Sequence, residues 1–292
     1  MNTSPSDNQP QKESDSYLLA FEDISFLREE ELRPIRLQLE MRKPELIQNR
    51  EGIRSTVVVF GSARIPHPDN TDALMKDVET ALEKDPKNEE LQQRKRIVER
   101  LCYKARYYDE ARKFASIVAN ACKKRSYRDY VVVTGGGPGI MEAANLGAHQ
   151  AGGKSIGLNI TLLGEQEPNP YVTPELSFQF HYFAIRKMHF LLRARALAAF
   201  PGGFGTFDEL FETLTLIQTQ KMEPVPIVLF GKEFWQEAIN MEFLVEEGVI
   251  SPGDLDLFHY VETAEEAWKY ITARENYPEN HIFRPLEKEG TS

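Results

Sequence analysis

Cysteine is scarce in this sequence, and the histidines do not cluster. The two cysteines, Cys102 and Cys122, lie in one helical region without a CxxC pair or a histidine partner. We therefore expect reduced thiols in the core rather than a disulfide or a metal site. The six histidines lack metal-binding spacing, and neither an HExxH motif nor a GxSxG nucleophile elbow occurs. The sequence gives no sign of a metal centre or of a serine nucleophile.

Long apolar runs and an excess of positive charge are missing as well. The longest apolar runs are far shorter than a membrane span, and Met1 to Pro5 lack the basic and then apolar pattern of a signal peptide. We expect a cytoplasmic protein. The formal charge of −10, from 35 basic and 45 acidic side chains, argues against a nucleic-acid polymer as partner. A small phosphorylated ligand is compatible with it, because local N–H groups and one or two arginines suffice for binding.

What the sequence does contain is an alternation of apolar runs and helical segments, with 41 % hydrophobic residues for a sizeable core. Runs such as Thr56 to Phe60, rich in β-branched residues, are typical of strands buried on both faces. The alternation predicts an α/β fold with a doubly wound parallel sheet and helices on both faces. Helices over 72–84 and 88–124 are expected between the first two strands. The expected strands are 56–60, 130–134, 155–160, 176–182, 196–200, 226–230 and 258–261.

Three segments are expected outside this core. Residues 1–16 are polar and predict a disordered tail. Residues 17–50 predict a helical arm that Pro44 ends, and that packs across the domain or onto a second subunit. Residues 70–100 predict a helical insertion whose many charges are most simply a solvated face. Because the sequence shows no repeat and no linker, residues 17–292 are expected to form a single domain.

The stretch Ala199 to Glu209, AFPGGFGTFDE, has the character of an anion site. An apolar run enters it as a strand, three glycines within four residues form a turn, and an apolar-periodic helix leaves it. Bare backbone N–H groups and the positive end of a helix dipole then face one point. Glycines let the backbone approach a phosphate that a Cβ atom would hold off. We expect the chemistry of the protein in this stretch.

A second glycine-rich turn follows the predicted strand 130–134. Its sequence from Gly135 to Asn145, GGGPGIMEAAN, has neither the GxGxxG spacing nor the GK[ST] of a P-loop. One such turn is weak evidence, but two in one chain, each between a buried strand and a helix, are considerably stronger. The first strand also ends in a small-residue turn at Ser62, at the edge where ligands of open parallel sheets bind. An ordinary turn serine is the alternative there.

Glu209 allows two interpretations. Thr206 and Glu209 fit the S/T-x-x-E capping box, in which Glu209 binds the backbone N–H of Thr206. In the other interpretation, the carboxylate beside a phosphate cradle answers positive charge that develops on the substrate. Cleavage of an N-glycosidic bond has an oxocarbenium-like transition state, which a carboxylate stabilises more than the ground state. The two roles can coexist.

Arg186 and Lys187 lie on the helix before the strand that enters the motif. Adjacent helix positions point about 100° apart, so we expect one of the two to face the pocket, with a surface pair as the alternative. A guanidinium there would bind phosphate through two N–H groups or polarise the leaving base.

The two glycine-rich motifs together resemble the LONELY GUY family of cytokinin riboside 5′-monophosphate phosphoribohydrolases, long mislabelled as lysine decarboxylases. The similarity runs from about Thr56 to Ile271, and the PGGxGTxxE pattern from Pro201 to Glu209 is fully met. The resemblance implies a Rossmann-like fold, a homodimer or higher homo-oligomer, and hydrolysis of nucleoside 5′-monophosphates to free base and ribose 5-phosphate.

By this resemblance, Glu209 and Arg186 are the catalytic residues. The sequence departs from the family where Met-His often precedes the Arg-Lys pair, since Phe183 and Ala184 stand there, and the arm and the insertion lie outside the family core. These departures bear on substrate identity and oligomeric state. The substrate-binding residues that the resemblance implies are Ser62, Gly136, Gly137, Gly139, Met141, Glu142, Lys187, Gly203, Gly205 and Thr206.

The sequence thus favours hydrolysis of the N-glycosidic bond of a nucleoside 5′-monophosphate, AMP or a modified purine, without a metal or organic cofactor. The alternative is a non-catalytic carrier of a nucleotide or of a molybdenum cofactor, as in proteins of similar fold. Arg186 and Glu209 favour the enzyme, since a carrier does not need a carboxylate at that spot. A decarboxylase would need a pyridoxal-bearing lysine and a site for the ring, and nothing in the sequence marks either.

Overall fold

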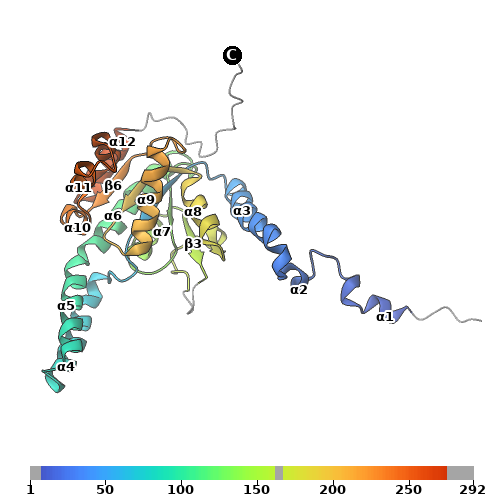
Figure 1. Ribbon diagram of the computed structural model, residues 1–292, viewed down its shortest axis with the longest axis horizontal. Coiled ribbons are helices and arrows are strands. Elements are labelled where there is room, and N and C mark those ends of the chain that lie inside the picture. Colours follow the sequence, from blue (N-terminus) through green and yellow to red (C-terminus); the bar gives the residue numbers. More distant parts are fainter. Residues whose placement is uncertain (1–7, 162–166, 275–292) are drawn as a thin grey trace, which may run out of the picture.

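A computed structural model describes residues 8–161 and 167–274, in which seven strands form one parallel sheet (Figure 1). The strand order is β4-β3-β2-β1-β5-β6-β7, and helices lie on both faces. Each strand overlaps a range predicted from the sequence, so the predicted α/β fold is confirmed. The strands are β1 (Thr56–Phe60), β2 (Val131–Thr134), β3 (Ser155–Ile160), β4 (Ser177–Phe180), β5 (Ala194–Ala199), β6 (Ile227–Phe230) and β7 (His259–Val261).

The direction of the winding changes between β1 and β5. From β1 the chain winds outward through β2, β3 and β4, and then returns to place β5 on the other side of β1. In the β1–β5 register Val57 pairs with Ala196, and just beyond it the Phe200 N–H donates to the carbonyl of Phe60 at 2.9 Å. After these two strands the chain continues to β2 on one side of the pair and to β6 on the other. Such a switch point leaves a crevice at the carboxyl edge of the sheet, where ligands of this fold class bind.

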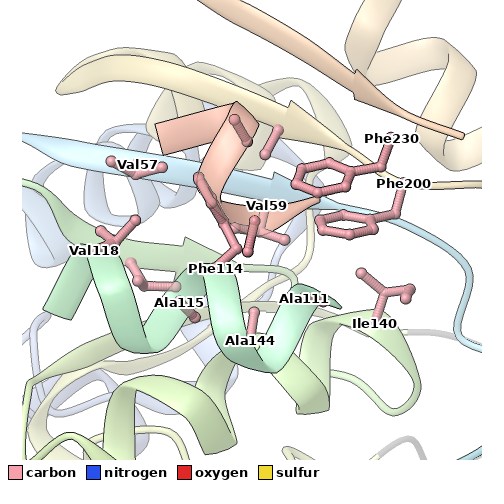
Figure 2. Packing of buried hydrophobic residues seen from close by; sticks show 14 of the residues in the cluster. Val57, Val59, Ala111, Phe114, Ala115, Val118, Ile140, Ala144, Phe200 and Phe230 are labelled. Carbon is pink, nitrogen blue, oxygen red and sulfur yellow. The ribbon is translucent and has the colours of Figure 1, made fainter. Parts of the chain in front are cut away.

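Side-chain alternation divides the core into two layers. Val57 and Val59 of β1 pack into one cluster, whereas Val58 and Phe60 pack into the other, because residues two apart on a strand share a face. Figure 2 shows the first cluster, in which the rings of Phe200 and Phe230 stack with their centroids 4.0 Å apart. This face is covered by α6 (Arg106–Lys124), α7 (Ile140–Gln150) and α12 (Ala264–Thr272); the other is covered by α8 (Phe183–Leu191), α9 (Phe204–Gln218) and α10 (Lys232–Ala238).

The N-terminal arm runs away from the rest of the molecule (Figure 1). Of the predicted disordered tail, residues 1–7 lie outside the described ranges, and residues 8–16 carry exposed side chains. Within the predicted tail, the structure has the short helix α1 (Gln9–Lys12) and the start of η1 (Asp15–Tyr17). The arm holds α2 (Ile24–Leu27), η2 (Glu30–Leu32) and α3 (Arg33–Arg50).

The expectation that Pro44 ends the arm helix is wrong, since Pro44 is buried inside α3. A proline in a helix interior removes one backbone hydrogen bond. Contacts from the body of the protein hold the helix beyond it. The Arg193 guanidinium donates to Asn49 Oδ1 at 2.8 Å and to both oxygens of Glu45 at 3.2 Å. Tertiary contacts therefore override the local signal.

The insertion is a helical hairpin that projects from the sheet (Figure 1). Its helices α4 (Thr71–Lys84) and α5 (Glu89–Lys104) enclose Val78 and Val98 between them, and α5 gives way to α6 at Ala105. The helical segment predicted over 88–124 is thus divided at Ala105 into two helices. None of the helices in the described ranges has the length and apolar character needed to cross a bilayer. The remaining elements are η3 (Pro68–Asn70), η4 (Pro174–Leu176), α11 (Met241–Glu246) and η5 (Pro252–Leu257).

The two cysteines are both free. Cys122 is buried in the second core cluster, and this burial raises the pKa of its thiol to about 11. Cys102 is half-buried in the hairpin, and its Sγ lies 3.7 Å from the carbonyl of Thr71. Thiols with raised pKa values are poor nucleophiles, so neither cysteine is a candidate for chemistry.

Candidate functional site

A pocket of about 810 Å³ opens at the switch point between β1 and β5. Its walls come from the turns after β1 and β2, from α8, from the first turns of α9 and from the end of α10. The carboxyl edge of the sheet thus brings together segments that are far apart in the sequence. The predicted site residues that line the pocket are Ser62, Met141, Arg186, Gly203, Gly205, Thr206 and Glu209.

The pocket contains a buried ion pair. Arg186 lies in the first turn of α8 and Glu209 in the second turn of α9, and Arg186 Nη2 donates to Glu209 Oε1 at 2.9 Å. The side chains are 13 % and 6 % exposed. The guanidinium also lies over the rings of Phe183 and Phe190, at 5.1 and 5.5 Å from their centroids. Arg186 Nε is buried with no hydrogen-bond acceptor in the described part of the chain.

The environment of Glu209 favours its neutral form. Burial raises the pKa of this carboxyl group to about 7, although Arg186 and Lys187 act to lower it. Removing a carboxylate from water costs more here than one shared hydrogen bond returns. A group that titrates near neutral pH suits acid–base work, and such a shift beside a charged partner in a cleft marks a candidate functional residue.

The predicted capping box of Thr206 and Glu209 is wrong. Helix α9 begins at Phe204 with Gly203 as its N-cap, and the Thr206 N–H donates to the Gly203 carbonyl at 2.9 Å. Thr206 is therefore already the third residue of the helix. The Glu209 carboxyl turns to Arg186 rather than to the backbone. The glycine-rich turn runs directly into the helix, so the N-cap lies three residues earlier in the chain than the sequence pattern predicts.

Two glycines at this helix start have no structural reason to be glycine. A Cβ atom added at Gly203 or Gly205 would meet nothing within 4 Å, and neither residue has a positive φ. At Gly202, by contrast, a Cβ atom would come within 2.1 Å of Thr206 Oγ1. In the described ranges, the N–H groups of Gly203, Phe204 and Gly205 find no acceptor. Bare N–H groups, open space and a helix N-terminus together fit a bound anion.

The glycines of the second loop have a packing role instead. Gly136 and Gly139 have φ values of +72° and +69°, and a Cβ atom at Gly139 would come within 2.4 Å of the Ser62 carbonyl oxygen. Asn169 donates from its backbone to the carbonyl of Gly136 and from its side chain to that of Gly137. These three glycines do not line the pocket. Gly139 lets the loop close onto the turn after β1, and Gly136 lets it approach the side chain of Asn159 in β3.

Two other predicted binding residues, Glu142 and Lys187, bind partners outside the pocket. Glu142 accepts a hydrogen bond from the Tyr108 hydroxyl at 2.8 Å. Lys187 forms ion pairs with Asp208 at 2.9 Å and Glu212 at 3.3 Å. Neither residue is part of the pocket wall. Of the adjacent pair on α8, Arg186 is the one that faces the pocket.

The apolar wall of the pocket was not predicted from the sequence. Phe60, Ile160 and Phe190 contribute from the sheet edge and α8, while Phe183 and Phe204 stand at the rim, 51 % and 94 % exposed. An aromatic residue between two glycines, as at Phe204, was the signal available in the sequence. Exposed rings beside an anion cradle are suited to stack on an aromatic base.

A second hollow, of about 790 Å³, lies at the opposite edge of the sheet. It is formed where α3, α6 and α7 end, and it includes Arg50, Arg128 and Lys154. Cations near helix C-termini offset the negative ends of the helix dipoles, which accounts for these side chains. Lys154 is already paired with Glu51 at 2.8 Å. We therefore assign the candidate site to the first pocket.

Residues 141–271 match the model of a family described as possible lysine decarboxylase. The predicted resemblance to the LONELY GUY family, long mislabelled in this way, is confirmed. The matched range holds both α8 and the start of α9, and hence Arg186 and Glu209. No lysine is among the described residues that line the pocket.

Solved structures with the same general arrangement share little sequence with this chain. The structural genomics target TM1055 is 19 % identical over 75 % of this chain and 99 % of its own, with a TM-score of 0.46. The molybdenum cofactor carrier protein from Chlamydomonas reinhardtii is 19 % identical over 75 % and 98 %, at 0.44. The molybdenum cofactor binding protein from Rippkaea orientalis is 18 % identical over 57 % and 86 %, at 0.43. No curated protein matches the sequence.

Proposed function

We propose that the protein hydrolyses the N-glycosidic bond of a nucleoside 5′-monophosphate, AMP or a modified purine, to free base and ribose 5-phosphate. One observation carries the proposal: the buried carboxyl group of Glu209, with its pKa raised to about 7, shares a pocket with a bare helix N-terminus. A phosphate cradle alone would be weakened by a nearby carboxylate. The combination is useful when the substrate develops positive charge in the reaction.

The substrate phosphate would bind at the start of α9. There the free N–H groups of Gly203, Phe204 and Gly205 and the positive end of a 15-residue helix converge on open space. The base would lie against the aromatic residues at the rim. Arg186 would bind phosphate or assist departure of the base, because its guanidinium lines the same pocket.

Glu209 would act at the sugar. As the C1′–N bond breaks, its electron pair passes to the base and positive charge develops at C1′ and the ring oxygen. The carboxylate stabilises this charge and accepts a proton from the water that attacks C1′. The base takes up one proton, so that water is divided between the two products.

The test is incubation of the purified protein with AMP, followed by chromatography of the products. We expect adenine and ribose 5-phosphate. The Glu209→Gln variant should retain nucleotide binding and lose roughly 10²- to 10⁴-fold in turnover. Glu246→Gln is the matched control, since Glu246 is exposed on α11 and is not part of the pocket wall. Absence of hydrolysis across purine and pyrimidine monophosphates would overturn the proposal.

Binding without turnover would instead favour a carrier of a nucleotide or a molybdenum cofactor. In that case the purified protein should show a pterin-like absorbance, and Glu209→Gln should bind the anionic ligand more tightly. The same preparation therefore distinguishes the two functions.

A further inference from the structure

The helix that carries Arg186 lacks a cap of its own. Its N-cap residue is Tyr182, whose side chain makes no capping hydrogen bond, and neither His181 nor Tyr182 is among the preferred capping residues. The cap comes from the arm. Glu40 of α3 accepts from the His181 N–H at 2.9 Å through Oε1 and from the Tyr182 N–H at 3.1 Å through Oε2. A carboxylate there also faces the positive end of the α8 dipole.

The same arm residue contacts the other end of α8. His189, in the last turn, is 4 % exposed, and its Nε2 lies 3.3 Å from the Glu40 carbonyl oxygen. Burial lowers the pKa of His189, which favours the neutral ring. In the tautomer protonated at Nε2, His189 donates to Glu40. One residue of the arm thus holds α8 through its side chain at the start and through its backbone at the end.

Arg186 lies within one turn of this cap. Its N–H donates to the Tyr182 carbonyl at 3.2 Å, so the backbone that Glu40 holds is the backbone from which the guanidinium extends to Glu209. Building on the proposed function, we propose that Glu40 is a positioning residue: it fixes α8 so that Arg186 stays in register with Glu209. The arm thereby becomes part of the active-site scaffold.

The pKa of Glu209 reports the position of α8, because charged residues on both helices act on it. Arg186 and Lys187 of α8 lower its pKa, whereas Asp208 and Glu212 on its own helix raise it. Both cations lie on α8. A shift of α8 away from α9 would therefore weaken the contributions of both cations and leave the two acidic neighbours in place.

The arm has a second attachment that does not involve Glu40. Arg193 donates to Glu45, to Asn49 and, at 2.7 Å, to the carbonyl of Ile53. Loss of the Glu40 carboxylate should therefore leave α3 docked and release only the N-terminal end of α8.

The experiment compares Glu40→Ala and Glu40→Gln with Glu31→Ala, a control at an exposed position of the same arm. In Glu40→Ala we expect kcat at pH 7 to fall roughly 10- to 100-fold, as for a displaced catalytic group. The acidic limb of the pH–rate profile should move to higher pH. Glu40→Gln keeps one acceptor oxygen and should recover part of both effects, and Glu31→Ala should match the wild type.

A merely structural role for Glu40 gives a different result. Both Glu40 variants would then lower the melting temperature and leave kcat per folded molecule and the pH profile unchanged, which overturns the proposal. Failure of the proposed function is separate from this, because it appears as absence of hydrolysis by the wild type. In that event, the titration of the Glu209 carboxyl, measured by NMR and assigned with Glu209→Gln, tests the positioning directly. An equal titration midpoint in wild type and Glu40→Ala would refute it.

Discussion

At the level of single residues, two opposing effects act on the pKa of Glu209, and burial is the larger. The ion pair with Arg186 favours the carboxylate, and burial favours the acid; the resulting pKa is about 7, above the ordinary value of 4.5. A buried pair of this kind is weak support for stability. We therefore explain the burial of Glu209 by function. A carboxylate in a less apolar environment would stay ionised and would pair more strongly with Arg186.

The first prediction concerns the pH dependence of hydrolysis. The carboxylate is the active form, so activity is lost as the pH falls through about 7, not through the ordinary glutamate range. Values of kcat/KM measured from pH 5 to 9 should show this limb. The substrate phosphate itself ionises near pH 6. A phosphorothioate analogue serves as control, because it moves the limb of the profile that comes from the substrate and leaves the limb that comes from Glu209 in place. A rate that is constant down to pH 5 would contradict the assignment.

The second prediction follows for stability. The native state holds the Glu209 proton more tightly than the unfolded chain, so this residue makes the protein less stable as the pH rises from about 4.5 to above 7. Glu209→Gln removes this dependence. Urea unfolding at pH 5 and pH 8 should show a smaller loss of free energy of unfolding in the variant than in the wild type. An unchanged pH dependence would mean that the carboxyl is ionised throughout.

Phe204 allows a third prediction at the same scale. Its side chain is 94 % exposed, so Phe204→Ala should change the free energy of unfolding by less than about 0.5 kcal/mol. Loss of stacking should raise KM for a purine monophosphate by roughly 5- to 100-fold. Steady-state kinetics and thermal melts measure both. Phe243→Ala, at a 49 % exposed position outside the pocket, should leave KM unchanged.

At the level of elements, the start of α9 separates the two tasks of a glycine-rich turn. Gly202 is needed for packing, whereas Gly203 and Gly205 leave space that the protein itself does not fill. The motif therefore combines one glycine that shapes the turn with two that leave its N–H groups accessible. In the second loop, Gly136 and Gly139 serve packing, because Gly136 lies against the Asn159 side chain and Gly139 against the turn after β1.

This division gives the fourth prediction. Gly205→Ala should preserve or slightly raise stability, since its φ suits alanine and alanine favours a helix, yet it should weaken binding of nucleotide and of inorganic phosphate. Gly202→Ala should lower the melting temperature through its clash with Thr206. Calorimetric titration with AMP, alongside thermal melts, distinguishes these outcomes. Equal phosphate affinity in Gly205→Ala and wild type would remove the anion site from this turn.

The elements show where sequence reasoning succeeds and where it fails. The inner strands were predictable because both of their faces are buried, which requires continuous apolar runs such as Val57 to Phe60. The edge strand β4 alternates between exposed and buried side chains instead, and its apolar residues Phe178 and Phe180 marked it in the sequence. The start of α9 was misplaced because spacing alone cannot distinguish Gly203 from Thr206 as the N-cap. Glu209 was singled out by the glycine-rich motif that ends with it, and Arg186 by the family resemblance. The cap of α8 could not be found, since Glu40 lies 142 residues before Tyr182 and no local pattern joins them.

At the level of the whole molecule, the helical hairpin is separable from the site. Its two ends meet where Cys102 Sγ lies 3.7 Å from the Thr71 carbonyl, while the pocket is lined by other segments. The hairpin buries Val78 and Val98 chiefly within itself. Its core is thus local, and its removal leaves the sheet and both covering layers in place.

The fifth prediction tests this separation. Replacement of residues 73–100 by a short glycine–serine linker should preserve folding and hydrolysis of AMP, with kcat within about twofold of wild type. Circular dichroism, thermal melts and the chromatographic assay check this. Sedimentation of the same pair of proteins shows whether the hairpin contributes to the predicted homo-oligomer. Loss of activity in a folded, unchanged oligomer would instead connect the hairpin to the site.

The switch point between β1 and β5 has a consequence for folding. The turn after β1 and the turn after β5 meet at a single hydrogen bond, from the Ser62 N–H to the Pro201 carbonyl at 3.1 Å, although the chain between them forms three further strands. Pairing across such a sequence separation is slow, because loop-closure entropy is lost before the contact forms. We therefore expect the walls of the pocket to come together late as the chain folds. Ligand that bridges the two turns would hold both halves of the sheet together, and the native state would gain stability in proportion to the logarithm of its concentration above the dissociation constant.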